Sequence, residues 1–477
     1  MKQLQKDLTE GSVAKGLMLF SVPFLLTNLL QALTNLADMV IVGRYVGAQG
    51  IAAVQVGGQV VLILTNMVAG LAMGATVLIG QYQGAGKQKE QKETIGTLMA
   101  LFAVVGAGST VLLLSLSSSI LKLLRTPEAA FADARAYLLI CSAGCLFLFG
   151  FQAISAVLRG MGDSTRPLYF MLISAVVNIA LDYIFIRFLN MRAAGAALGA
   201  VLAEMVSLSA AVIYLVRKKF AFDFKPKSFR FYKGKTSLIC RIGLPTTVQY
   251  SITGLSFLLL TGLANHIAGV VGATMLGIGS RINSFGVLPC QAMSSSISAM
   301  TAQNVGANKP DRAKKATLIG CAVAFGVSAL VFVLVALFPQ QITGFFLSNA
   351  SRNTGDANLV RQCLELGPKY LFWVGFDYLF AAVFFSTNGI ATGSGHTWFA
   401  MINSAINALV LRIPAAYLLT SSIGGGLGMM GMAYAIGLAP SVSAVIGTIY
   451  LFSGKWKKPR IPLAEGEKTK QPAQKGQ

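Results

Sequence analysis

The chain contains two copies of one sequence pattern. At a constant offset of 222 residues, and without gaps, residues 14–100 align with residues 236–322. The identities fall on residues that bend, cap or closely pack the backbone: Pro23 with Pro245, Gly47 with Gly269, Gly50 with Gly272, Gly57 with Gly279, Gln81 with Gln303, Gly84 with Gly306, Ala85 with Ala307 and Lys87 with Lys309. A second offset, of 229, pairs Gly160 with Gly389, Asn178 with Asn407, Gly195 with Gly424 and Gly199 with Gly428. We therefore expect two related halves, and paired repeats in an apolar chain are typical of transporters.

Composition places both halves in a lipid bilayer. Hydrophobic residues make up 55% of the 477 residues, charged residues 12%, and the mean hydropathy is +0.66. Stretches of about 20 apolar residues, enough to cross the hydrocarbon as a helix, recur near 14–42, 51–79, 94–117, 136–157, 168–189, 194–216, 237–263, 272–301, 314–338, 366–388, 397–420 and 430–453. The sequence predicts an all-α membrane protein with twelve transmembrane helices in two pseudo-symmetric six-helix bundles. The expected units are an N-terminal lobe (1–217), a basic cytoplasmic linker (218–236), a C-terminal lobe (237–454) and a disordered cytoplasmic tail (455–477).

The net charge of +22 is distributed in the way that orients a membrane protein. If the N-terminus is cytoplasmic, the cytoplasmic segments carry 28 Lys and Arg residues and the external segments 9. This excess predicts that both termini face the cytoplasm. The positive charge therefore indicates contact with membrane lipids and no nucleic-acid partner.

Sequence motifs for enzymes and cofactors are missing. The Gly84-Ala85-Gly86-Lys87 segment resembles the end of a phosphate-binding loop, but Gln88 replaces the required Ser or Thr. There is no Gly-x-Ser-x-Gly elbow and no His-Glu-x-x-His zinc helix. We expect no enzymatic activity, no cofactor and no bound metal.

Four carboxylates fall inside predicted membrane helices: Asp38, Asp182, Glu204 and Asp377. An Asp at the centre of such a helix costs about 2.5–3.5 kcal/mol, so each needs a partner, a water-filled cavity or a proton. A carboxyl removed from water holds its proton more tightly and can exchange it near neutral pH. These residues are the first candidates for ion coupling.

Asp38 ends a polar stripe on the first helix. Asn28, Gln31, Asn35 and Asp38 lie on one side of a helix with 3.6 residues per turn. Pro23 removes one backbone hydrogen bond and can bend the same helix. The alternative is a structural kink with an interior hydrogen-bond network; a coupling role is favoured because the helix offers no basic partner for Asp38.

The fifth helix carries a second stripe, Ser174, Asn178 and Asp182. Asn178 is one turn from Asp182, so its amide can hydrogen-bond the carboxyl. In the second half, the Asn recurs as Asn407 but Leu411 replaces the Asp, and Leu260 stands where Asp38 would be. We expect Asp38, Asn178 and Asp182 to bind the coupling cation, in one lobe only.

Other polar residues are possible ion or substrate contacts. Glu204 either joins the same site or pairs with a basic group at a helix end, and Asp377 can form an ion pair with Arg281 or Arg412. Gln249 and Thr253 share one edge of the seventh helix and can line a substrate path. The ring of Tyr183 can stack on a cationic ligand.

These residues resemble a family, the multidrug and toxic compound extrusion transporters, over residues ~10 to 455. The resemblance rests on Pro23 with Asp38, on the Gln81–Gly84–Ala85–Lys87 loop and its copy, and on the Leu158-Arg159-Gly160-x-Gly162-Asp163 turn that leads to Asn178 and Asp182. It implies two six-helix lobes, a proton site at Asp38, Asn178 and Asp182, and bending at Pro23. Sodium-coupled members use acids in helices 7 and 10. Asp377 matches the helix 10 acid, but no acidic residue occurs between Asp223 and Asp311, so the helix 7 acid is missing.

The expected function is export by a monomer in the bacterial plasma (inner) membrane. A cation, with H⁺ favoured over Na⁺, exchanges for amphipathic organic cations by alternating access. The alternatives within transport are a Na⁺-coupled drug antiporter and a flippase for lipid-linked sugars, which would need extra helices and a basic cavity. A membrane enzyme or passive channel would need a catalytic cluster or a pore-lining repeat that the sequence lacks.

Overall fold

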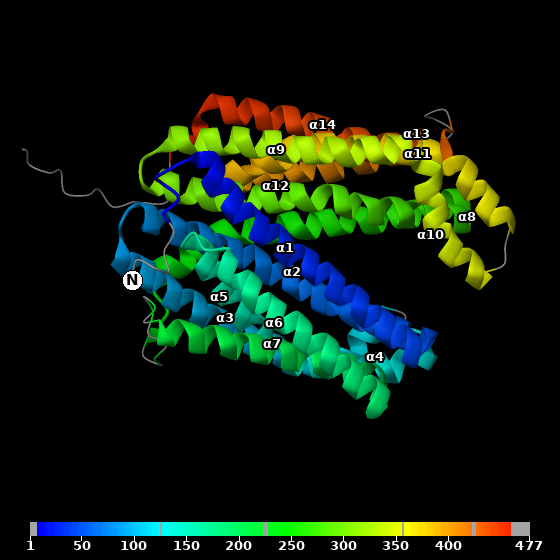
Figure 1. Ribbon diagram of the computed structural model, residues 1–477, viewed down its shortest axis with the longest axis horizontal. Coiled ribbons are helices and arrows are strands. Elements are labelled where there is room, and N and C mark those ends of the chain that lie inside the picture. The colour runs from blue at the N-terminus through cyan, green and yellow to red at the C-terminus, as the bar shows by residue number, and fades with distance from the viewer. Residues whose placement is uncertain are drawn as a thin grey trace, which may run out of the picture.

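The computed structural model describes residues 7–124, 126–218, 220, 222, 225, 228–354, 357–421 and 426–458. Within these ranges every regular element is a helix, and the helices form two bundles (Figure 1). Both described ends of the chain lie at one end of the molecule, where Arg312 binds the Glu10 carbonyl and Lys457 lies 3.2 Å from Asp311. We call this end the terminal face.

The first bundle, the N-lobe, is built from the helices α1 (Val13–Tyr45), α2 (Ala48–Gly84), α3 (Gln88–Leu123), α4 (Glu128–Ala143), α5 (Cys145–Gly160), α6 (Thr165–Tyr183) with the π-helical turn η2 (Ile184–Phe188), and α7 (Arg192–Arg217). The second bundle, the C-lobe, is built from α8 (Lys233–Gly306), α9 (Pro310–Leu337), α10 (Pro339–Thr354), α11 (Ala357–Gly393), α12 (Thr397–Ala405), the π-helical turn η4 (Ile406–Arg412), α13 (Ile413–Thr420) and α14 (Gly428–Ser453). A short 3₁₀ turn, η6 (Lys455–Lys457), follows.

The twelve predicted spans all fall on helices. Among the described residues, ten helices are long and apolar enough to cross a membrane, and α4 and α5, which bend by 50° where they meet, pass the same test together. The 74-residue α8 contains two of the predicted spans, because Ala268 and Gly269 interrupt its helical geometry. The predicted fold class is therefore confirmed.

The repeat explains the break in α8. Gly47 lies between α1 and α2 with φ +85°, and its copy Gly269 has φ +51°. Both occupy backbone conformations that side chains rarely adopt, at the same point of each half. The first turn of the N-lobe and the break in α8 are thus the same structural feature.

Helix α1 belongs to both lobes. Its first turns, with Leu17 and Phe20, are buried in a hydrophobic core that, apart from these turns and Leu8, consists of C-lobe residues. Near its other end, Val42 packs with Ile186 and Ala196 of the N-lobe. Pro23 follows directly after the part that is buried in the C-lobe, and its carbonyl accepts a 2.8 Å hydrogen bond from the Thr27 hydroxyl.

The repeated Gln-x-x-Gly motif joins the lobes near the terminal face. The Gln81 side chain donates to the Gly393 carbonyl (3.0 Å), and the Gln303 side chain donates to the Gly160 carbonyl (3.1 Å). A Cβ at Gly84 would lie 1.9 Å from the Gln303 carbonyl oxygen, and one at Gly306 would lie 2.1 Å from that of Gln81. Only glycine permits this approach of α2 to α8.

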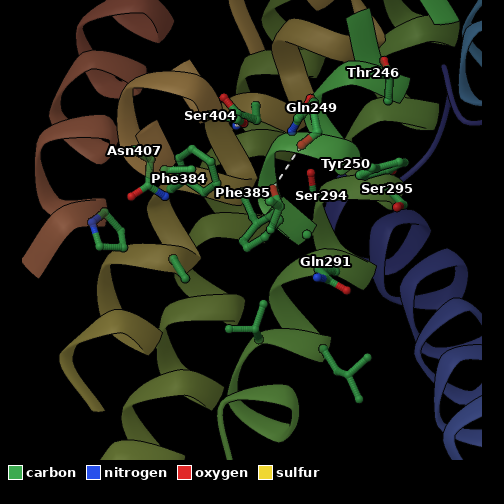
Figure 2. Close-up of a pocket in the computed structure, with 18 of the residues that line it drawn as sticks. Thr246, Gln249, Tyr250, Gln291, Ser294, Ser295, Phe384, Phe385, Ser404 and Asn407 are labelled. Atoms are coloured by element: carbon green, nitrogen blue, oxygen red, sulfur yellow. Dashed lines mark hydrogen bonds between the residues drawn. The ribbon is translucent and has the colours of Figure 1, made fainter. Parts of the chain in front are cut away.

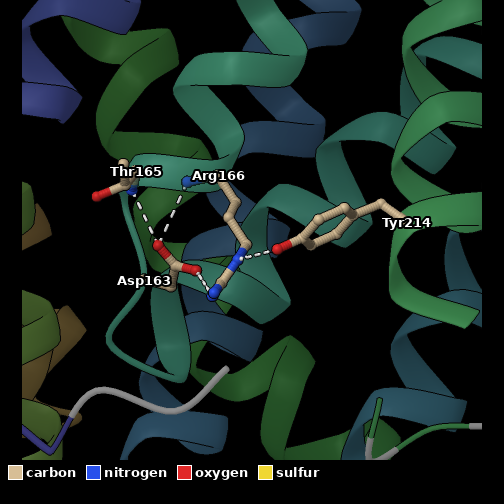
Figure 3. A network of polar contacts seen from close by, with 4 residues as sticks. All are labelled: Asp163, Thr165, Arg166 and Tyr214. Atoms are coloured by element: carbon tan, nitrogen blue, oxygen red, sulfur yellow. Dashed lines mark hydrogen bonds and ion pairs between the residues drawn. The ribbon is translucent and has the colours of Figure 1, made fainter. Parts of the chain in front are cut away.

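The turn between α5 and α6 is fixed by Asp163 (Figure 3). One carboxyl oxygen accepts hydrogen bonds from the backbone N–H groups of Thr165 (3.0 Å) and Arg166 (3.3 Å) at the start of α6. The other pairs with the Arg166 guanidinium, which also donates to the Tyr214 hydroxyl of α7 (3.0 Å). This motif therefore orients α6, which carries Asn178 and Asp182.

Three details differ from the sequence prediction. The disordered tail does not begin at residue 455, because Lys455–Lys457 form a turn in which Trp456 is fully buried; residues 459–477 lie outside the described residues. Helix α8 begins at Lys233, inside the predicted linker. Helix α10 was not expected, because its 16 residues are too few for a span.

Candidate functional site

The structure brings Asp38 and Asp182 together. The two side chains, from α1 and from the last turn of α6, are close enough to share a hydrogen bond. The Asn178 amide donates to the Asp182 carboxyl at 3.2 Å, as the spacing predicted. Asp182 is fully buried and Asp38 half-buried. We call Asp38 and Asp182 the carboxyl pair.

One oxygen of each acid in the carboxyl pair has no donor. Oδ1 of Asp38 and Oδ2 of Asp182 are buried without a hydrogen-bond partner in the described part of the chain. Two carboxylates in contact repel when both are ionised, whereas one shared proton supplies a donor between them. The arrangement can therefore hold or release a proton.

Helix α7 closes one side of the carboxyl pair. A Cβ at Gly199 would lie 2.2 Å from Oδ1 of Asp182, and one at Gly195 would lie 3.1 Å from Phe185. The Gly195-x-x-x-Gly199 spacing is thus a close helix contact in lipid. From α4, Tyr137 and Cys141 lie near Asp182.

The other residues of the predicted polar stripe on α1 lie in two different environments. Gln31 and Asn35 are exposed and hydrogen-bond each other at 3.3 Å. Asn28 points into a second feature, a cavity between the lobes. One helix therefore contributes both to the carboxyl pair and to this cavity.

This central cavity has a volume of about 650 Å³. Its walls come from α1, α2, α8, α11, α12, η4 and α14, and the predicted contacts Gln249 and Thr253 are among the lining residues. Figure 2 shows polar side chains of α8 together with aromatic and amide side chains of α11 and η4 around this cavity: Gln249, Gln291 and Ser294 from α8, and Phe384, Phe385 and Asn407 from α11 and η4. Asp38 and Asp182 do not line it.

Asp377 lines the central cavity as one half of an ion pair. Its Oδ1 accepts from Nη2 of Arg412 at 2.9 Å, and its Oδ2 accepts from the Asn283 amide at 2.7 Å. All three side chains are buried. Of the two arginines that the sequence offered, Arg412 is the partner, whereas Arg281 is exposed.

Two predicted contacts lie outside both features. Glu204 does not line the cavity, and its Oε2 is buried without a hydrogen-bond partner within the described ranges. Tyr183 is 37% exposed, contacts the guanidinium of Arg187 and packs edge-on against Tyr45. Neither prediction gains support from the geometry.

Sequence reasoning missed Asn283 and Gly199 as neighbours of the buried acids. Asn283 is an uncharged residue two positions after Arg281, which is the residue of this segment that drew attention, and its partner Asp377 is 94 residues away. Gly199 was recognised as a packing residue, but the spacing did not reveal that Asp182 is what it packs against. The repeat offered one signal, because Asn407, which lines the cavity, is the copy of Asn178.

Comparison with known proteins matches the two halves separately. Residues 23–184 and 245–418 each match the model of the MatE family, and the two matches start 222 residues apart. The relatives include the probable multidrug resistance protein YpnP of Bacillus subtilis, which is 28% identical over 95% of this chain and 98% of its own length. An FAD transporter of Shewanella oneidensis is 24% identical over 71% of this chain and 75% of its own length.

A solved structure of a MOP superfamily transporter from Pyrococcus furiosus superposes with a TM-score of 0.87 at 23% identity. The superposition covers 95% of this chain and 98% of that one. The expected resemblance and the two-lobe fold are both confirmed by these matches. The chain is a multi-pass membrane transporter rather than an enzyme, and it belongs to the MatE family of multidrug efflux transporters.

Proposed function

We propose that the protein exports amphipathic organic cations by exchange for H⁺ and alternates between two open states. The observation that carries the proposal is the contact between Asp38 and Asp182, with an oxygen of each lacking a donor. Asn178 is the third member of this proton site, and Pro23 is the point at which α1 bends. Inward movement of one positive charge yields about 2.3 kcal/mol per 100 mV of membrane potential.

The link between proton and substrate runs along α1. Asn28 lines the central cavity and Asp38 belongs to the carboxyl pair, ten residues or about 15 Å further along the helix. A shift of α1 on protonation therefore changes a wall of the cavity. Such a difference between states is what coupling requires, because a ligand shifts an equilibrium only through differential affinity.

Sodium coupling has less support. Both carboxyl oxygens of Asp377 already accept hydrogen bonds, one of them from a guanidinium. A cation there would have to displace Arg412. We therefore assign the coupling role to the N-lobe. We also propose that the protein lies in the inner membrane of a bacterial cell, with both termini and the terminal face in the cytoplasm.

Relatives named as multidrug resistance proteins support a drug-like substrate, whereas the relative named an FAD transporter has a different one. The central cavity suits the first class, since ligand pockets of about 300–1,000 Å³ accept drug-sized molecules. We further propose that Gln249 and Thr253 contact the substrate and that the protein acts as a monomer.

The test is ethidium efflux from everted vesicles under separate pH and sodium gradients. We expect a pH gradient to drive efflux and a sodium gradient to have no effect. Asp38→Asn should abolish pH-driven efflux at unchanged protein level in the membrane. The control is Asp311→Asn, which removes an exposed ion pair with Lys457 in the C-lobe. Sodium-driven efflux by the wild type, or full activity of Asp38→Asn, would overturn the proposal.

A further inference from the structure

The hydrogen-bond capacity of the buried ion pair is unevenly used. Each carboxyl oxygen of Asp377 already has a donor, from Arg412 and from Asn283. The guanidinium of Arg412 offers five N–H donors. One hydrogen bond engages Nη2, and Nε is buried without an acceptor among the described residues. The ion pair therefore has unused N–H donors and no unused carboxyl oxygen, so it can bind a further hydrogen-bond acceptor.

The surroundings keep Arg412 in place. Its guanidinium carbon lies 5.7 Å from the centre of the Phe257 ring, and the ion pair fixes one of its edges. A planar guanidinium held in this way can bind a carboxylate with parallel hydrogen bonds. Since Arg412 lines the central cavity, the acceptor would come from a molecule in that cavity.

The charge around the cavity also favours an anion. Among the described lining residues, Asp377 is the only acid and Arg412 the only base. A second cation, Arg159 of α5, lies behind the wall, with its guanidinium carbon 5.6 Å from the ring of the lining residue Phe24. The five ion pairs found in the described ranges do not include Arg159. The charges of the lining residues balance, and Arg159 adds one positive charge behind the wall.

The other lining residues indicate which further groups a bound ligand would carry besides the carboxylate. Phe24, Tyr250, Phe257, Phe384 and Phe385 supply aromatic surface. Oδ1 of the lining residue Asn407 is buried without a donor, so it can accept a hydrogen bond from an ammonium group. A planar aromatic molecule with an ammonium and a carboxylate would use the aromatic surface, Asn407 and Arg412 together.

We infer that the central cavity recognises amphipathic substrates that carry a carboxylate, and that Arg412 is the residue that binds this group. This inference rests on the proposed export function and adds a preference, among amphipathic organic cations, for those that also carry a carboxylate. Asp377 is a positioning residue, because it holds the guanidinium and contributes no free oxygen. A cation without a carboxylate leaves Nε of Arg412 unpaired and faces the field of Arg159.

The probe is a matched pair of ligands, norfloxacin and its ethyl ester, which differ in one free carboxylate. Binding of each to the purified full-length protein is measured by calorimetry without an ion gradient. Hydrogen bonds to charged groups predict that the acid binds roughly 10- to 100-fold more tightly than the ester. Equal affinities for acid and ester would overturn the inference.

Variants assign the preference to Arg412. The double variant Arg412→Gln/Asp377→Asn removes both charges together, which avoids an unpaired buried charge. It should bind the acid and the ester with equal affinity. Arg412→Lys keeps the charge but loses the planar fork, and should lower acid affinity about 10-fold. The control Arg281→Gln removes an exposed arginine of the same lobe and should change neither affinity.

The binding assay is independent of ion coupling. Asp38→Asn should keep the full preference for the acid, even where it abolishes pH-driven efflux. Loss of efflux with the preference intact supports both proposals. A double variant that loses acid and ester affinity equally would show that Arg412 acts only in folding and would overturn the substrate assignment alone.

Discussion

Replacement of Gly84 by Ala should open the protein at the terminal face. The new methyl group would start 1.9 Å from the Gln303 carbonyl oxygen, which belongs to the backbone of α8 and cannot rotate away. Contacts of this kind below 3 Å are not tolerated, so α2 and α8 must separate by at least about 1 Å. The two lobes contact each other at this point only when the protein is closed at the terminal face. The strain therefore destabilises that closed state.

The magnitude follows from the contacts that would be lost. Overpacking of a close helix contact costs about 1–3 kcal/mol. The separation also stretches the hydrogen bonds from Gln81 to Gly393 and from Gln303 to Gly160, each worth about 0.5–1.5 kcal/mol. The closed state should lose roughly 2–6 kcal/mol, which shifts its population relative to the open state by about 30- to 10⁴-fold.

The assay measures access to the cavity from the terminal face. Ser298 is a buried lining residue next to Met73 of α2. In the Ser298→Cys background, Gly84→Ala should speed labelling by an impermeant maleimide added to everted vesicles. Gly108→Ala is the control, because a Cβ there meets nothing within 4 Å; vesicles without the new cysteine give the background. Equal labelling of Gly84→Ala and Gly108→Ala would refute the role of this contact.

Three further substitutions test other parts of the structure. Gly199→Ala places a methyl group 2.2 Å from Oδ1 of Asp182 and should break the Asn178 hydrogen bond, so the pH profile of efflux should shift while membrane levels stay normal; an unchanged profile contradicts the contact. Glu204→Gln replaces a buried carboxyl that lacks a partner and should leave pH-driven efflux unchanged with equal or higher thermal stability; a loss of efflux would place Glu204 in the coupling site. Pro23→Ala restores a backbone hydrogen bond and should slow transport without weakening norfloxacin binding; transport at the wild-type rate would exclude bending there.

The fold could be predicted because its signals are local or periodic. Each apolar stretch marks one crossing of the membrane, and the repeat identifies Gly47 and Gly269 as equivalent turns even though Gly269 lies at a break within the long helix α8. Helix α10 escaped because it is too short to give the hydropathy signal of a span. The burial of Trp456 was not predicted, because the sequence of a polar tail does not show which hydrophobic core the residue packs against.

The candidate site could be predicted only where its residues share a helix. The spacing of Asn178 and Asp182 predicted their hydrogen bond, and two costly acids on different helices suggested a common site. The partners of Asp377 and the walls of the central cavity depend on how seven helical elements pack. That packing is a tertiary property, which no pattern along one helix reports.

The course of α1 sets a mechanical limit on any movement of the two lobes. Leu17 is anchored in one bundle and Val42 in the other, and a single helix with no break in its backbone geometry connects them. The bundles cannot swing apart at the terminal face while this rod stays both straight and anchored. Either Leu17 and Phe20 leave the hydrophobic core in which they are buried, or α1 bends at Pro23, where the helix already lacks one backbone hydrogen bond. The coupling along α1 acts in both directions, so a molecule bound in the cavity against Asn28 strains the helix that carries Asp38.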